Sequence, residues 1–262
     1  MNPFNTLQLQ RCSDGVATLW LDRPDKHNAF NAEMIAELAA ILSELAEDPT
    51  LRLLLLRGRG KHFCAGADLA WMQASARLDY TANLADAQAL GDVLQRLYEL
   101  PVPTLAVVHG AAFGGAVGLT ACCDIAIGTD DALFSLSEVR IGLVPAVISP
   151  YVVQAIGARA CRRYALSAER FDGDRARELG LLAETCAAAA LDASVERWCA
   201  MLLNNGPQAL RACKQLLATV GNGALSEETR CYTERTIAAV RVSAEGQEGL
   251  QAFLDKRRPN WA

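Results

Sequence analysis

Apolar residues form short runs in the first half of the chain, and amphipathic stretches separate these runs. Runs with the length and the Leu, Ile and Val content of buried strands cover residues 16–22, 51–58, 104–108 and 124–129. Asn31 is placed to cap a helix that extends through about Glu47, and a second helical pattern covers about 80–100. This alternation predicts an α/β core with parallel strands.

Strand signals end after about Ile148, and only helical patterns follow. The predicted helices cover roughly residues 150–166, 172–180, 188–204, 207–220 and 226–254. No linker or low-complexity segment separates this tail from the core. We therefore predict one α/β core, residues 1–190, that carries the functional site. Residues 191–262 form a helical subdomain that covers the core or pairs with other subunits.

The charge balance limits the possible partners and chemistry. The 262 residues include 30 acidic and 25 basic side chains, and the net charge of −5 gives no footprint for nucleic acid or an anionic membrane. Three histidines, at positions 27, 62 and 109, argue against a His-rich metal site, and we expect no metal. Acid–base chemistry is therefore expected from a carboxylate.

Two further features bear on location. The nine cysteines are odd in number and form no CxxC pair, and the first ten residues lack the pattern of an export signal, so we expect a cytoplasmic protein. Residues 100–123 are long enough and apolar enough to cross a membrane. Pro101, Pro103 and the glycines that follow instead favour a strand, a turn and a buried helix.

Two glycine-containing turns stand out, HFCAGADL at 62–69 and HGAAFGGAVGL at 109–119. Each follows an apolar strand and leads into a helical pattern. Backbone N–H groups at a helix N-terminus are unpaired, so two such turns facing each other would bind a developing oxyanion. Either turn alone is weak evidence, because glycine often only marks a connection.

Five segments in order resemble the enoyl-CoA hydratase/isomerase family, also called the crotonase superfamily. These segments are LDRPDKHNAFN at 21–31, HFCAGADLAWM at 62–72, VHGAAFGGAVGLTACCDIAI at 108–127, SLSEVRIGLVPAVISP at 135–150 and GLQAFLDKRRPNW at 249–261. Within the family, these segments are most similar to those of bacterial methylglutaconyl-CoA hydratases of leucine catabolism and of hydratases of isohexenylglutaconyl-CoA in acyclic-terpene catabolism. The resemblance implies a crotonase-like spiral of ββα turns with a helical C-terminal subdomain. It also implies an acyl-CoA substrate, no separate cofactor, and a homotrimer or a hexamer built from two trimers.

The resemblance assigns the catalytic groups. The backbone N–H groups of Ala67 and Gly115 would grip the thioester carbonyl, and Glu138 would be the catalytic carboxylate. The family's first catalytic glutamate falls at Gly118, so this chain has one carboxylate where the family has two. Glu138 lies in a semi-apolar turn, where burial would raise its pKa toward the range useful for proton transfer. A surface glutamate paired with Arg140 is the competing interpretation.

The missing glutamate suggests a substrate. Hydration of an enoyl thioester needs a polarised carbonyl, a water at C3 and a proton for C2. We hypothesise that the distal carboxylate of a branched, dicarboxylic enoyl-CoA fills the space opened at Gly118. Tyr151 is a candidate for binding that distal end, from its position alone.

The remaining substrate contacts also follow from the resemblance. The expected CoA-binding positions are Arg23, Lys26, Ala29, Ala65, Asp68, Phe253 and Lys256. Asp68 is also placed to cap the helix that follows the first glycine turn. Phe253 and Lys256 would reach a CoA bound to a neighbouring subunit. Cys64 lies close to Ala67, but it is interpreted as a buried small residue rather than a nucleophile.

Three other functions stay open at this point. An enoyl-CoA isomerase needs only one carboxylate to move a proton between carbons, and a CoA-ester hydrolase would use the same scaffold. A non-catalytic acyl-CoA-binding or RNA-binding scaffold is the third, although the sequence pI of about 5.3 counts against RNA. The length of the acyl tail and the choice between trimer and hexamer also stay open.

Overall fold

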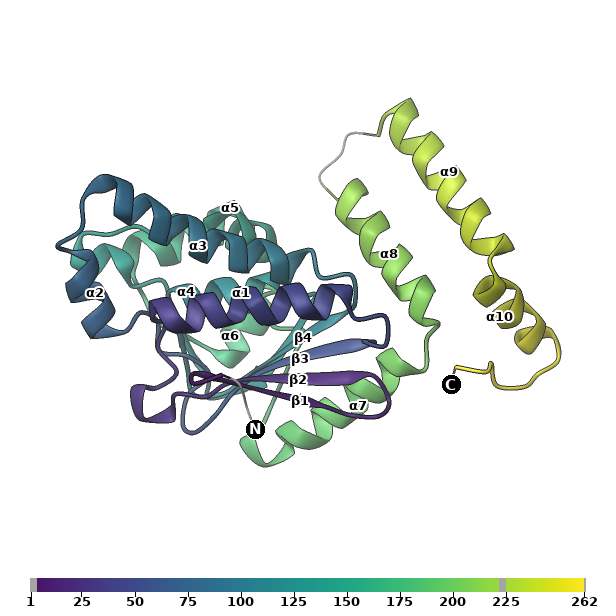
Figure 1. The fold of residues 1–262 in the computed structure, drawn as a ribbon, viewed down its shortest axis with the longest axis horizontal. Helices are drawn as coiled ribbons and strands as arrows, with labels where there is room; N and C mark the ends of the chain where they lie inside the picture. The colour runs from purple at the N-terminus through teal and green to yellow at the C-terminus, as the bar shows by residue number, and fades with distance from the viewer. Residues whose placement is uncertain (1–3, 222–224, 262) are drawn as a thin grey trace. The chain divides into compact units, whose positions relative to one another are not determined.

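The computed structural model describes residues 4–221 and 225–261, in which strands and helices alternate before helices take over (Figure 1). The strands are β1 (Leu7–Arg11), β2 (Val16–Leu21), β3 (Leu53–Gly58), β4 (Thr104–Val108), β5 (Ala111–Phe113), β6 (Ile125–Thr129), β7 (Leu133–Ser135), β8 (Phe171–Asp172) and β9 (Glu184–Cys186). The α-helices are α1 (Ala32–Glu47), α2 (Leu69–Ser75), α3 (Tyr80–Tyr98), α4 (Gly115–Cys122), α5 (Ser149–Ser167), α6 (Gly173–Glu178), α7 (Leu191–Leu203), α8 (Pro207–Val220), α9 (Glu227–Val242) and α10 (Ala244–Leu254). Short 3₁₀ helices are η1 (Pro24–Lys26), η2 (Glu138–Ile141) and η3 (Ala188–Ala190).

A six-stranded sheet in the order β1-β2-β3-β4-β6-β9 forms the centre of the core. The β1–β2 pair is antiparallel, and the other pairs are parallel. All five residues of β4 are buried, as are five of the six residues of β3. Their near-continuous apolar runs are typical of strands covered on both faces, so the prediction of a parallel α/β core is confirmed.

A second, smaller sheet has the order β5-β7-β8, and two isolated parallel bridges extend it, Cys64 with Ala112 and Phe30 with Ala67. Three turns of the chain, beginning with β2, β3 and β4, therefore contribute first to the large sheet and then to the small sheet before a helix follows. Strands β4 and β5 show this order, and α4 comes next. This repeat is the spiral of ββα turns that the resemblance implies.

The helices of the core begin where their caps predict. Asn31 accepts a hydrogen bond from the Met34 amide at 2.9 Å, so α1 starts at the expected residue. Helices α1 and α3 lie side by side over the sheet (Figure 1). Helix α4 packs against α3 and α5, and six of its eight residues are buried. The apolar stretch 100–123 is thus β4, β5 and a core helix, and no helix in the described part of the chain is long and apolar enough to span a membrane.

Two predictions for the second half are wrong. Strand signals do not end at Ile148, because β8 and β9 follow, but strands of two and three residues are too short to show a period. The helix predicted over 226–254 is two helices, α9 and α10, that meet at Ser243. Ser243 takes an extended backbone conformation, and its hydroxyl accepts the Gly246 amide at 3.0 Å to cap α10.

The chain divides into two compact units. One unit holds residues 1–100 and 104–195, and the other holds residues 101–103 and 196–262, so the division lies inside α7, just beyond the predicted boundary at residue 190. Within the helical unit, the Glu245 carboxylate on α10 accepts the amides of Gln208 and Ala209 at 3.0 and 2.8 Å. This side chain supplies the N-terminal cap that Gly206 cannot give α8.

Candidate active site

Three parallel segments of the small sheet run in register and end at the same edge. Cys64 pairs with Ala112, and Ala112 pairs with Phe134. Ala67 follows Cys64 by three residues, and Gly115 follows Ala112 by three residues. Glu138 follows Phe134 by four residues. Because parallel segments leave a sheet in the same direction, the fold brings these three predicted residues to one edge.

A glycine with positive φ precedes each of the two amides. Gly66 has φ +99° and precedes Ala67, and Gly114 has φ +54° and precedes Gly115. Only glycine adopts these angles without strain, and here they turn the chain sharply out of the sheet. In the described part of the chain, the amides of Ala67 and Gly115 donate to no protein acceptor. Both are therefore available to an oxygen of a ligand.

Phe30 holds the two turns together. Its amide donates to the Gly66 carbonyl at 2.7 Å, and its carbonyl accepts the Asp68 amide at 2.8 Å, so its backbone brackets Ala67. Its ring packs on the other turn, because a Cβ built on Gly115 would lie 3.0 Å from Phe30 Cε2. Phe30 is only 2% exposed. One buried residue therefore sets the position of both amides.

Glu138 begins η2 and turns its carboxylate toward the second of these turns. A Cβ built on Gly114 would lie 3.1 Å from Glu138 Oε1. The side chain is half-buried, and its Oε2 is buried without a hydrogen-bond partner in the described structure. Burial raises the pKa of Glu138 above its ordinary 4.5. The competing interpretation is wrong, since Arg140 donates to the Ala168 carbonyl at 2.8 Å and not to Glu138.

The predicted space beside Gly118 does not exist. Gly118 is buried in α4, and a Cβ built on it would lie 2.3 Å from Cγ2 of Ile148 and 3.6 Å from Cδ2 of Leu94. Ile148 is itself 3% exposed. The absence of a side chain at Gly118 is thus matched by an isoleucine packed directly over it. The assignment of Gly118 as a substrate-binding position with room for a distal carboxylate is wrong.

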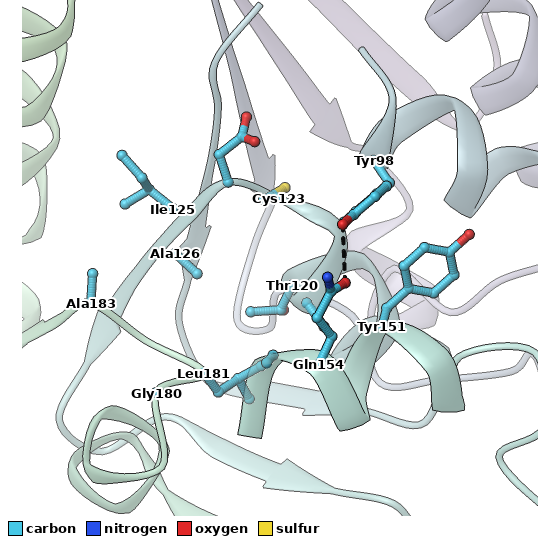
Figure 2. A pocket seen from close by; sticks show the side chains of 13 residues that line it. Tyr98, Thr120, Cys123, Ile125, Ala126, Tyr151, Gln154, Gly180, Leu181 and Ala183 are labelled. Atoms are coloured by element: carbon cyan, nitrogen blue, oxygen red, sulfur yellow. Dashed lines mark hydrogen bonds between the residues drawn. The ribbon is translucent and has the colours of Figure 1, made fainter. Parts of the chain in front are cut away.

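Tyr151 lies at the far end of α4 from Gly115. It lines a cavity of about 280 Å³ together with Thr120 and Cys123 near the C-terminus of that helix. Figure 2 shows Tyr151 beside Tyr98 and Gln154, and the Tyr98 hydroxyl donates a hydrogen bond to Gln154 Oε1 at 3.0 Å. An eight-residue helix is about 12 Å long, and this length separates the cavity from the edge that carries Glu138. Binding of the acyl end by Tyr151 stays a prediction.

The predicted CoA-binding segment forms a separate cavity of about 350 Å³, lined in part by Arg23, Lys26 and Asp68. The Arg23 guanidinium donates to Asp68 at 2.9 Å and to the Ala29 carbonyl at 2.6 Å, so it braces this segment. Asp68 also accepts the Ala70 amide at 2.8 Å and caps α2, as predicted. Lys26 is exposed, so its charge can reach a phosphate.

The other predicted contacts differ in accessibility. Ala29 is 8% exposed, so its side chain offers little surface to a ligand. Ala65 is half-buried, and its amide donates to the His27 carbonyl at 3.0 Å. Phe253 and Lys256 lie at the end of α10 in the helical unit, where Phe253 is 81% exposed. Their contact with a neighbouring subunit stays a prediction.

Nucleophilic and metal chemistry find no support in the described structure. Cys64 is fully buried, and this burial raises the pKa of its thiol to about 12. A thiol with that pKa is not a nucleophile at neutral pH. Among residues 4–221 and 225–261, no group of three His, Cys, Asp or Glu side chains is arranged to hold a metal ion.

Comparison with known proteins decides the family. The sequence model of the enoyl-CoA hydratase/isomerase family matches residues 11–262. The chain belongs to the enoyl-CoA hydratase/isomerase family. The crystal structure of an enoyl-CoA hydratase from Shewanella pealeana shares 46% sequence identity with this family member at a TM-score of 0.95, over 99% of this chain and 97% of that one.

Two further relatives of this hydratase/isomerase family member widen the comparison. The structure of Pseudomonas aeruginosa AtuE is similar at 38% identity and a TM-score of 0.95, and the match covers 98% of this chain and 100% of that one. The 1,2-epoxyphenylacetyl-CoA isomerase of Escherichia coli is 30% identical over 97% of each chain. Relatives of the chain therefore include proteins named as hydratases and as isomerases.

Sequence reasoning missed two residues of this hydratase/isomerase site. Phe30 was noticed only as part of a longer motif, and Ile148 only as part of the segment after Glu138. Both act through contacts with glycines that are far away in sequence, Gly115 and Gly118. Two glycines in a buried helix are the signal that large side chains pack closely against it.

Proposed function

We propose that this family member hydrates the 2,3 double bond of an enoyl-CoA, with Glu138 as its one catalytic carboxylate. The observation that carries the proposal is the partly buried Glu138, whose unpartnered Oε2 lies at the same edge as the free amides of Ala67 and Gly115. Two N–H groups that converge on the thioester oxygen stabilise the negative charge that develops there. The raised pKa of Glu138 suits a group that both accepts and gives a proton.

The proposed reaction is balanced with a single carboxylate. Glu138 accepts a proton from water as the water oxygen bonds to C3, and the electron pair of the double bond moves toward C2 and the thioester oxygen. The amides of Ala67 and Gly115 stabilise this enolate. Glu138 then gives the proton to C2, and the site returns to its starting state.

The substrate proposed is a branched, dicarboxylic enoyl-CoA of the methylglutaconyl type, as in leucine or acyclic-terpene catabolism. Support comes from the resemblance of SEVRIGLVPAVISP to hydratases of this kind and from the absence of a second glutamate at Gly118. Ile148 fills the position beside Gly118, so a second hydrogen-bond partner for the attacking water, besides Glu138, must come from elsewhere. A carboxylate of the substrate remains our proposal for this second partner. No separate cofactor is needed, and a cytoplasmic homotrimer or hexamer is the proposed assembly.

An isomerase is the second candidate, and the same observation favours it. One carboxylate suffices to move a proton between two carbons, and no second carboxylate lies beside Gly118. Some relatives also carry isomerase names. The two candidates differ in whether water becomes part of the product.

The test is a turnover assay with crotonyl-, methylglutaconyl- and isohexenylglutaconyl-CoA in ¹⁸O-labelled water. Hydration predicts label at C3 of the product, whereas isomerisation predicts a shifted double bond without label, and free thiol would reveal hydrolysis. Equal kcat/KM for crotonyl-CoA and the dicarboxylic substrates would refute the substrate proposal while leaving hydration intact. Binding without turnover on every substrate would refute catalysis and favour a scaffold.

A further inference from the structure

The hydrogen-bond ladder between residues 62–65 and 109–113 becomes irregular at His62 and Phe63, where the Phe63 amide instead of the His62 amide donates to the His109 carbonyl at 2.8 Å. Cys64 donates to the Ala111 carbonyl at 3.0 Å and accepts the Phe113 amide at 3.1 Å, as in a regular parallel pair. One step back in this register, the Ala111 amide should donate to the carbonyl of His62. Instead it donates to the imidazole Nδ1 of His62 at 3.0 Å.

The backbone carbonyl of His62 is already occupied. It accepts the side-chain amide of Asn28 at 2.8 Å, and Asn28 is fully buried. The imidazole therefore replaces a backbone acceptor in the ladder. Gly110 makes this possible, because it has φ +60° and any Cβ there would lie 2.7 Å from His62 Nδ1 and 2.2 Å from the Lys61 carbonyl.

This bond determines the protonation state of the ring. A backbone amide is a donor only, so Nδ1 of His62 must carry a lone pair, and the ring is neutral whenever the bond exists. Protonation at Nδ1 would place two hydrogen-bond donors opposite each other. The Ala111 amide would then have no acceptor, although Ala111 is a buried residue, only 7% exposed. The hydrogen bond from the Ala111 amide to His62 Nδ1, which we call the His62 rung of the ladder, thus depends on pH.

The His62 rung lies just before the two glycine turns that lead to Ala67 and Gly115. From Cys64 the chain reaches Ala67 in three residues, and from Ala111 it reaches Gly115 in four. We propose that His62 is a positioning residue, whose neutral imidazole holds the two oxyanion turns in register and whose protonation uncouples them. It touches no substrate atom and acts through the backbone of Ala111.

The surroundings of His62 favour its neutral form. Burial lowers the pKa of His62 below its ordinary 6.5, and the positive charges of His27, Lys61 and His109 lower it further. These are the charged groups that face the ring: the ring of His27 packs edge-on at 5.1 Å, and His109 donates to the Gly60 carbonyl at 2.9 Å. The rung is therefore intact at neutral pH and is lost only on acidification.

The experiment measures kcat/KM against pH for the wild type, His62→Asn and His109→Asn. Asn keeps an acceptor close to the position of Nδ1 but does not titrate. In the wild type, Glu138 and His62 must both be unprotonated, so the slope of log kcat/KM against pH approaches two below both pKa values. In His62→Asn the slope becomes one, and each pH unit below the pKa of His62 gives this variant an advantage of about tenfold over the wild type.

The matched control separates the rung from a general effect of histidine loss. His109→Asn removes an imidazole of the same cluster whose hydrogen bond is to the Gly60 carbonyl and not to a backbone amide, so its slope stays at two. A slope that is the same in the wild type and His62→Asn overturns the proposal. The activity measurement rests on the proposed function, so a second measurement that needs no turnover accompanies it.

That second measurement is an ¹⁵N NMR titration of the wild-type protein, in which only three imidazoles contribute. The proposal predicts an unprotonated Nδ1 on His62 at neutral pH, and amide shifts at Ala111, Ala67 and Gly115 that follow the titration of this ring. Protonated Nδ1 at neutral pH, or a titration that leaves those amides unmoved, overturns it. An enzyme without turnover would refute the proposed function alone, and a misfolded His62→Asn variant would leave the decision to this titration.

Discussion

The contact between Phe30 and Gly115 makes Gly115→Ala a sharp test of how the two turns are held. The added Cβ would lie 3.0 Å from Cε2 and 3.4 Å from Cδ2 of the Phe30 ring. Because Phe30 is 2% exposed, its ring has no space to yield into. Overpacking of this kind costs about 1–3 kcal/mol, against about 0.5–1 kcal/mol that alanine gains over glycine in a helix. We expect a net loss of about 1 kcal/mol in the free energy of unfolding, and of at most about 2.5 kcal/mol.

The same substitution should lower activity by more than its effect on stability implies. A shift of Phe30 moves its backbone, which brackets Ala67 through the Gly66 carbonyl and the Asp68 amide. Loss of one oxyanion donor lowers kcat by about 10²–10³, so a partial displacement of both should lower kcat by at least about tenfold. The assay is kcat and KM on the best enoyl-CoA substrate, together with urea unfolding.

A control and a rescue complete this test. Gly91→Ala in α3 places its Cβ 3.6 Å from Val147 Cγ1, an ordinary contact, so this variant should keep wild-type kcat and gain about 0.5–1 kcal/mol in the free energy of unfolding. Phe30→Leu shortens the ring that Gly115→Ala meets, so the double variant should lose less than the two single variants combined. Additive effects within about 0.5 kcal/mol, or wild-type kcat in Gly115→Ala, would refute the role of this contact.

Three further variants probe the site. Glu138→Gln should lower kcat by about 10²–10⁴ while the protein stays folded, and wild-type turnover would remove Glu138 from the mechanism. Since burial raises the folded-state pKa of Glu138 above 4.5, the stability that its protonated form contributes is lost as pH rises through that pKa. In urea unfolding, Glu138→Gln should therefore gain stability relative to the wild type as pH rises from the unfolded-state pKa of 4.5 through the higher folded-state pKa of Glu138. Cys64→Ala should keep kcat, because burial holds the pKa of the thiol at about 12; a large loss of kcat would reopen nucleophilic catalysis. Lys26→Glu should raise KM for CoA thioesters several-fold at low salt with kcat unchanged, and a KM independent of salt in the wild type would argue against a phosphate contact.

Much of the core follows from local sequence signals. The apolar run at 104–108 is strand β4 residue for residue, and the side chains of Asn31 and Asp68 cap the helices they were expected to cap. These signals are strong because burial on both faces and capping each demand particular residue types at adjacent positions.

The small sheet was beyond such reasoning, although it positions the site. Strands β5 and β7 have three residues each, and the bridges at Cys64 and Ala67 involve single residues. No periodicity exists over so short a span, and the pairing joins residues that are 22 to 48 positions apart, such as Ala112 with Phe134 and Cys64 with Ala112. The glycine turns were recognised, but the register that aligns them with Glu138 could be seen only in the structure.

The pairing of Gly118 with Ile148 changes how the single carboxylate should be understood. A glycine where the family resemblance leads one to expect a glutamate first suggests an open pocket, in which a substrate group could take the place of the expected carboxylate. The 2.3 Å separation between a Cβ on Gly118 and Ile148 Cγ2 shows instead that this position is filled by hydrocarbon. Restoring a glutamate would therefore require a small residue at position 148 as well, so the two positions are sterically coupled. The groups identified at this site among the described residues are Glu138 and the two backbone amides, and for that reason substrate comparison is more informative here than mutation of Gly118 alone.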